Sequence, residues 1–251
     1  MIQTYSKAKQ DGFTLVEIAI VLVIIGLLLG GILKGQELIT SARVRNMADL
    51  NSSVQAAYYG FIDRYRQVPG DIAAGAGPGQ AGRVIGPNVP GCPGACVGAG
   101  GGAGNGLINS GDWGEASAVW AHLAAAGFLT GGYQGGAAGA GTYIGGTIAP
   151  TNPYGGVLLL AQTADYDSNA ATPVRLNLVL GAQTPVRVTQ ELDTKLDDGS
   201  PQTGVLRAAV PGPTGFAGPA TLGATTCVNA GPPATWNVGN DDPNCNTVYL
   251  Y

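Results

Sequence analysis

Charged residues are scarce in this chain of 251 residues, which contains 12 Lys and Arg and 16 Asp and Glu. A disordered chain combines high charge with few apolar residues, whereas 45% of these residues are hydrophobic, so the composition argues against general disorder. The formal net charge of −4 argues against a nucleic-acid-binding protein, which would present a basic face. We therefore expect no specific nucleic-acid partner.

Histidine and cysteine are also rare. The single histidine, His122, excludes a His-rich metal site and leaves little for acid–base catalysis near neutral pH. Four cysteines are too few for a disulfide scaffold but enough for two bridges. No Ser nucleophile in a recognisable elbow and no set of metal ligands emerges, so we expect no enzyme, and an exported enzyme is the least favoured function.

The chain does have one long apolar run, from Phe13 to Leu33, in which only Thr14 and Glu17 are polar. As a helix, these 21 residues would span roughly 32 Å, the thickness of the hydrocarbon core of a bilayer. Lys7 and Lys9 precede the run, and positive charge there keeps the N-terminal end cytoplasmic. The sequence thus predicts a single membrane span with the C-terminal bulk outside the cytoplasm.

Two simpler interpretations of this run fit less well. A cleaved signal peptide would need an Ala-x-Ala-like site after a short apolar stretch, and Leu27–Leu33 continues without one. A simple membrane anchor explains the length but not Glu17, because an ionised carboxylate in an apolar medium is costly unless it is paired. Glu17 is therefore a candidate functional residue.

The residues around Glu17 carry a family resemblance. They read Gly12-Phe13-Thr14-Leu15-Val16-Glu17 and are followed at once by the uninterrupted apolar run. This string resembles the cleavage and methylation signature of type IV prepilins and of the related pseudopilins of type II secretion. The resemblance implies that a prepilin peptidase cuts after Gly12, removes residues 1–12 as a leader and methylates the new N-terminal Phe13. It also implies that Glu17 acts in assembly.

The chemistry of that assembly role is straightforward. Cleavage after Gly12 frees a positive amine on Phe13, one helical turn from Glu17. In a filament of staggered helices, the amine of one subunit can meet the Glu17 carboxylate of a neighbour, and each charge then neutralises the other in an apolar medium. The expected partners are the peptidase, the inner membrane before assembly, and further copies of the chain or other pilins.

The sequence predicts an α+β fold in which a long N-terminal helix packs on a small antiparallel sheet with long Gly-rich loops. A spine helix is expected over 13–68, with 13–33 as its transmembrane and assembly part and an amphipathic remainder. Pro69 disfavours helix at Val68 and ends it. Residues 69–251 are expected to form an exported head.

Two further helices are expected in the head. Asp112 and Glu115 have the spacing of a capping box, and Gly127 supplies a stop, with His122 on the polar side or at the rim. Thr184 can cap a second helix whose first residue is Pro185 and which ends at 197–199. Alternating or continuous apolar residues predict strands near 157–161, 174–180, 205–210 and 247–251. The Pro- and Gly-rich tail predicts a thin core beyond the sheet.

The four cysteines form two candidate pairs. Cys92 and Cys96 lie in a Gly-rich loop that a disulfide between them would close, and free thiols are the alternative. Cys227 and Cys245 favour a disulfide if the domain is exported to an oxidising compartment. Pilins often link their C-terminal region in this way, so the resemblance implies the same pair. Zinc binding would need Cys227, Cys245 and His122 to join the first two thiols.

A calcium candidate lies at Asp193, Asp197 and Asp198. Three carboxylates within six residues could collect a hard cation such as Ca²⁺, which favours oxygen ligands. The alternative is a helix end followed by a solvated Asp-Gly turn. Residues 193–204 also resemble a loop of larger prepilin-like proteins. No metal or cofactor is otherwise expected.

These features together predict a prepilin-like structural subunit, either a major or a minor pilin, of a type IV pilus-like or type II secretion-like filament. The precursor would cross the inner membrane once, and the assembled filament would be extracellular or periplasmic. The alternative is a membrane-tethered binding or adhesin protein that does not polymerise. The sequence leaves open whether such a filament serves motility, adhesion, uptake or secretion.

Overall fold

The computed structural model describes residues 14–72, 104–137, 139–168, 170–210, 216 and 225–251. The chain divides into two compact units, Met1–Ala42 and Arg43–Tyr251. The element order is α1 (Leu15–Tyr65), α2 (Trp113–Ala125), β1 (Leu159–Thr163), β2 (Arg175–Val179), α3 (Val186–Leu196), β3 (Leu206–Ala208), η2 (Thr225–Cys227), β4 (Val228–Asn229), β5 (Thr235–Trp236), η3 (Val238–Asn240) and β6 (Thr247–Leu250).

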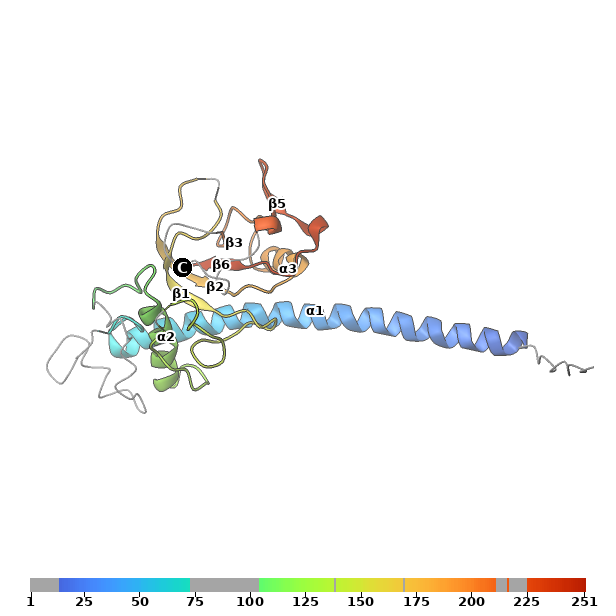
Figure 1. Ribbon diagram of the computed structural model, residues 1–251, viewed down its shortest axis with the longest axis horizontal. Coiled ribbons are helices and arrows are strands. Elements are labelled where there is room, and N and C mark those ends of the chain that lie inside the picture. Colours follow the sequence, from blue (N-terminus) through green and yellow to red (C-terminus); the bar gives the residue numbers. More distant parts are fainter. Residues whose placement is uncertain (1–13, 73–103, 138, 169, 211–215, 217–224) are drawn as a thin grey trace, which may run out of the picture. The chain divides into compact units, whose positions relative to one another are not determined.

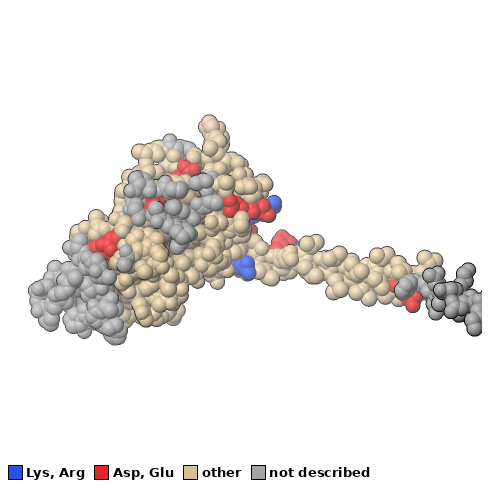
Figure 2. Space-filling view, in the orientation of Figure 1, with Lys and Arg blue, Asp and Glu red and all other residues tan. Residues whose placement is uncertain are grey.

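In the first unit, α1 is an apolar helix with no covering layer. Its large apolar side chains between Leu15 and Ile39 are all exposed, Leu15 at 91% and Leu27 at 73%. By length and composition the helix is able to cross a membrane. Figure 2 shows this stretch as a surface of uncharged residues with only scattered charged groups. A helix that is apolar on all sides needs a lipid or protein environment.

In the second unit, the rest of α1 is amphipathic, as predicted. Its buried residues recur at three- and four-residue steps and enter the main core. They are Val44, Met47, Asn51, Val54, Ala57, Tyr58, Phe61 and Tyr65. The helix ends at Tyr65, and Arg66 adopts a left-handed φ of 57° directly after it. This end lies close to the one predicted from Pro69.

The main sheet has four antiparallel strands in the order β1-β2-β6-β3. Leu178 on β2 pairs with Leu160 on one side and with Tyr249 on the other, and Tyr249 also pairs with Leu206 on β3. The last strand of the chain, β6, is therefore central. Figure 1 shows these strands beside the C-terminal part of α1. The predicted α+β fold with a small antiparallel sheet is confirmed.

Both edges of the sheet make further backbone hydrogen bonds. At the β1 edge the Gln162 N–H donates to the Ile108 carbonyl at 2.9 Å. At the β3 edge the Ala208 N–H donates to the Pro201 carbonyl at 2.9 Å, and the Ala208 carbonyl accepts from Asp167 at 2.8 Å. Loop residues thus pair with part of each edge and occupy backbone groups that could otherwise pair with another chain.

Helix α2 begins and ends as predicted. The Asp112 side chain accepts from the Glu115 N–H at 3.0 Å, and Gly127 has a positive φ of 79° just after the helix. The predicted rim position of His122 is wrong, because every residue from Trp113 to Leu123 is buried and this helix has no polar side. His122 Nδ1 accepts the Gly70 N–H at 2.8 Å instead.

Helix α3 begins one residue later than predicted. Its N-cap is Pro185 rather than Thr184, and no side chain caps it. The backbone of Thr184 is occupied elsewhere, since its N–H donates to the Cys245 carbonyl at 3.2 Å and its carbonyl accepts from Cys245 at 2.8 Å. These two backbone hydrogen bonds pair Thr184 with Cys245 as in an antiparallel sheet. The helix therefore begins after Thr184, at Val186.

A second, small core lies beside α3. It contains Val186, Ala208, Cys227, Trp236 and Cys245. The two-stranded β4–β5 ladder contributes Trp236, and that ladder was not predicted from the sequence. These are the buried members of this core within the described residues. Most of the Pro- and Gly-rich tail lies outside the described residues, so the expectation of a thin core there stays a prediction.

Candidate functional site

The predicted assembly residue Glu17 lies in the first turn of α1. Its Oε2 accepts hydrogen bonds from the Thr14 N–H at 2.9 Å and from the Thr14 hydroxyl at 2.8 Å. In return, the Thr14 hydroxyl oxygen accepts from the Glu17 N–H at 3.3 Å. This is a capping box, for which the Thr-x-x-Glu spacing was the available signal in the sequence. Gly12 and Phe13 lie outside the described residues.

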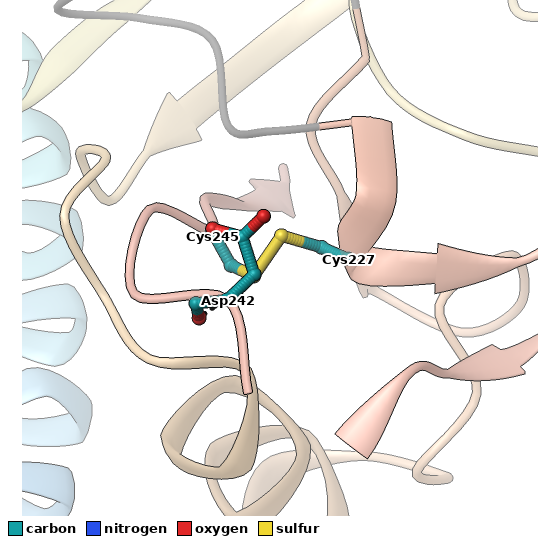
Figure 3. Close-up of side chains that lie close together, drawn as sticks. All are labelled: Cys227, Asp242 and Cys245. Carbon is teal, nitrogen blue, oxygen red and sulfur yellow. Dashed lines mark hydrogen bonds between the residues drawn. A yellow bond between two sulfur atoms is a disulfide. The ribbon is translucent and has the colours of Figure 1, made fainter. Parts of the chain in front are cut away.

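The predicted pair Cys227–Cys245 is a disulfide with a Cα–Cα distance of 5.8 Å. It connects the end of η2 to the segment that leads into the central strand β6. The Asp242 carboxylate lies beside it (Figure 3) and accepts from the Thr226 hydroxyl and, at 2.9 Å, from the Asn244 N–H. Since the two sulfurs are bonded to each other, they offer no thiolates to zinc. Cys92 and Cys96 lie outside the described residues.

The predicted calcium candidate has a buried member, Asp193, which lies on α3 and is fully inaccessible. Its Oδ2 accepts the Trp236 indole N–H at 2.7 Å, while Oδ1 has no hydrogen-bond partner within the described part of the chain. Burial raises the pKa of Asp193 to about 6, the indole hydrogen bond lowers it in part, and the nearby carboxylates of Asp198 and Asp197 raise it further.

The other two members, Asp197 and Asp198, organise the loop after α3. Asp197 Oδ2 accepts the N–H groups of Val205 at 2.5 Å and Leu206 at 3.0 Å. Asp198 accepts the Thr203 hydroxyl at 2.5 Å, and this bond lowers the pKa of the carboxyl. Ligand atoms of the three aspartates lie within 4.8 Å of one another, a spacing that could hold a cation. Loop hydrogen bonds also satisfy the carboxylates of Asp197 and Asp198 without a cation, so the calcium site stays an untested prediction.

Comparison with known proteins gives one match, at the N-terminus. A family model described as the prokaryotic N-terminal methylation motif matches residues 7–33. No curated protein and no solved structure matches the chain. The matched residues contain the Gly12-Phe13 junction, Thr14 and Glu17, and they run into the exposed apolar part of α1. The chain therefore carries the prepilin-type N-terminal methylation motif that is characteristic of type IV pilins and pseudopilins.

Proposed function

We propose that this protein is a structural subunit of a type IV pilus-like or type II secretion-like filament. The observation that carries the proposal is the methylation motif joined to an apolar helix that no part of its own unit covers. Residues 1–12 would be removed as the leader, 13–68 would form the spine and 69–251 the head. Such a helix is stable in a bilayer as a precursor and among similar helices in a filament.

The proposed assembly contact joins opposite charges at the start of α1. A prepilin peptidase would free the amine of Phe13, and this amine would pair with the Glu17 carboxylate of a neighbouring copy or of another pilin. Pairing removes the cost of two isolated charges in an apolar medium and so favours correct alignment of the spine helices. The precursor would be anchored in the inner membrane, and the filament would lie outside the cytoplasm.

The second candidate function is a tethered binding protein that does not polymerise. The head has few charges and several Gly-rich segments, and the visible surface in Figure 2 is largely uncharged. Such a surface suits either packing between subunits or contact with another protein. The assembly role of Glu17 separates the two functions, since a tethered head needs no charge at that position.

The test compares filament yield for the wild type, Glu17→Gln and Glu37→Gln in cells that also express a prepilin peptidase. Glu37 is the matched control, because it lies on the same helix, after the apolar run, and already has a partner in Lys34 at 2.5 Å. The proposal predicts filaments from the wild type and Glu37→Gln, and loss of filaments from Glu17→Gln. Equal behaviour of all three chains, with the head displayed at the membrane, would favour the tethered binding protein.

A further inference from the structure

The turn at residues 104–109 contains the one Asn-Gly pair of the sequence, Asn105-Gly106. An asparagine before glycine loses ammonia readily, because glycine has no side chain to shield its backbone nitrogen. That nitrogen attacks Cγ of the asparagine, a C–N bond forms, and the side-chain amide leaves as ammonia. Water then opens the cyclic imide to aspartate or isoaspartate. Asn105 is exposed, so water can reach it.

The nitrogen that would attack is held in place in the folded protein. The Gly106 N–H donates to Asp71 Oδ2 at 2.5 Å, and the Gly104 N–H donates to Oδ1 of the same carboxylate at 2.7 Å. The Asp71 side chain is buried. Gly106 has a φ of 84°, a conformation that favours glycine. Asp71 thus fixes the backbone on both sides of Asn105.

The negative charge of Asp71 also opposes the reaction. The Gly106 nitrogen attacks only after it loses its proton, and the anion that then develops would face a buried carboxylate. A like charge at this distance disfavours the charged form. The hydrogen bond must also break before the nitrogen can turn toward Cγ, and hydrogen bonds to charged groups are among the stronger ones. Both effects slow the loss of ammonia in the folded state.

The side chain of Asn105 also connects this turn to α2. Its Oδ1 accepts the Leu107 N–H at 2.9 Å, and its Nδ2 donates to Asn109 Oδ1 at 3.0 Å. Asn109 in turn donates to the Glu115 carboxylate on α2, from its N–H at 2.5 Å and from Nδ2 at 3.0 Å. Conversion of Asn105 to an acid removes the donor to Asn109 and places a carboxylate opposite the Asn109 oxygen.

We propose that Asn105 is a deamidation site which Asp71 protects, and that conversion of Asn105 to aspartate or isoaspartate loosens residues 104–109 from α2. The reaction consumes water and releases ammonia, so it needs no enzyme. The product accumulates with the age of the protein, because each opening of the turn frees the Gly106 nitrogen. The modification is independent of the proposed filament function, since it involves residues of the head alone.

Substitutions separate protection by Asp71 from a general effect of charge. Asp71→Asn keeps the size of the side chain but removes its charge and one of its two acceptor oxygens. Asp63→Asn is the matched control, because it removes the same charge near the same end of α1, where Asp63 is exposed and pairs with Arg66 at 3.4 Å. Asn105→Asp introduces the product directly. Asn105→Gln is the blank for the chemistry, because a glutamine would have to form a larger ring.

The experiment incubates the full-length chain at pH 7.5 in a mild detergent, with and without urea, and follows the conversion of Asn105 by peptide mass spectrometry. We expect conversion in the folded wild type and in Asp63→Asn to be at least roughly tenfold slower than in urea, the factor that a hydrogen bond to a charged group supplies. Asp71→Asn should lose most of this protection. Amide hydrogen exchange of residues 104–109 should be faster in Asn105→Asp than in the wild type, with exchange of β1 unchanged.

Equal conversion of Asn105 in the folded wild type and in urea would overturn the proposed protection, and so would wild-type conversion in Asp71→Asn. Exchange of β1 reports whether Asp71→Asn is folded. If it is not, exchange of the Gly104 and Gly106 amides in the wild type decides, because exchange as fast as in the unfolded chain would exclude a protective Asp71. Wild-type exchange of residues 104–109 in Asn105→Asp would overturn the loosening of the turn.

Discussion

Replacement of Asp193 by asparagine is expected to stabilise the head at neutral pH. The carboxyl of Asp193 is fully buried, and only one of its oxygens has a hydrogen-bond partner within the described residues. Its pKa is about 6 in the folded protein and about 3.8 in an unfolded chain. Ionisation above pH 6 therefore places a poorly compensated charge in the small core, beside two other carboxylates.

The direction and the size of the stability change follow from this difference between the folded and unfolded pKa of Asp193. A group whose pKa is raised by folding binds its proton more tightly in the native state, so its contribution to stability is complete below about pH 4 and is lost as the pH rises through 6. Two pH units correspond to about 3 kcal/mol. The side chain introduced by Asp193→Asn cannot ionise, and its carbonyl oxygen can still accept the Trp236 indole N–H. We expect the variant to be more stable than the wild type by about 2 to 3 kcal/mol at pH 7.5 and equal to it at pH 4.

The assay is urea unfolding of the full-length chain in a mild detergent, followed by tryptophan fluorescence at pH 4 and at pH 7.5. Glu191→Gln is the matched control on the same helix, because Glu191 is partly exposed and bonded to Lys195 at 2.6 Å. The substitution Glu191→Gln should change the free energy of unfolding only slightly at both values of pH. A loss of stability for Asp193→Asn at pH 7.5 would refute the reasoning and would indicate that the native protein uses the charged carboxylate, for example to hold a cation.

Three further predictions concern the same region. Cys227→Ser with Cys245→Ser should lower the free energy of unfolding by about 3 kcal/mol in the same urea assay. Gly204→Ala should destabilise by about 2 kcal/mol, because φ is 70° and a Cβ would collide with the Asp197 carboxylate that two backbone N–H groups hold in place. Gly132→Ala, which has open space, is its control and should be near neutral. Finally, EDTA should leave the thermal midpoint unchanged, since loop donors already bind two of the aspartates; a midpoint that rises with added Ca²⁺ would instead establish the calcium site.

Features set by neighbouring residues were predictable from the sequence. The apolar run, the amphipathic half of α1 and the α2 boundaries at Asp112 and Gly127 all depend on contacts within a few residues. The strand positions followed from apolar alternation, and the order of the strands did not. The capping box of Thr14 and Glu17 is equally local and was open to prediction.

Features set by distant partners were not predictable. His122 is buried because α2 is covered on all sides, and its partner Gly70 lies 52 residues away. Thr184 fails to cap α3 because it bonds with Cys245, 61 positions later in the chain. The buried state of Asp193 depends on Trp236 in a two-residue strand, whose length is too short for a periodic signal. Each of these follows from tertiary packing rather than from a local pattern.

The most direct test of the filament account is the intact mass of the protein recovered from sheared filaments of cells that co-express a prepilin peptidase. The account predicts a chain of residues 13–251 that carries one additional methyl group on Phe13. An uncut chain that stays in the membrane in the presence of active peptidase would contradict the account.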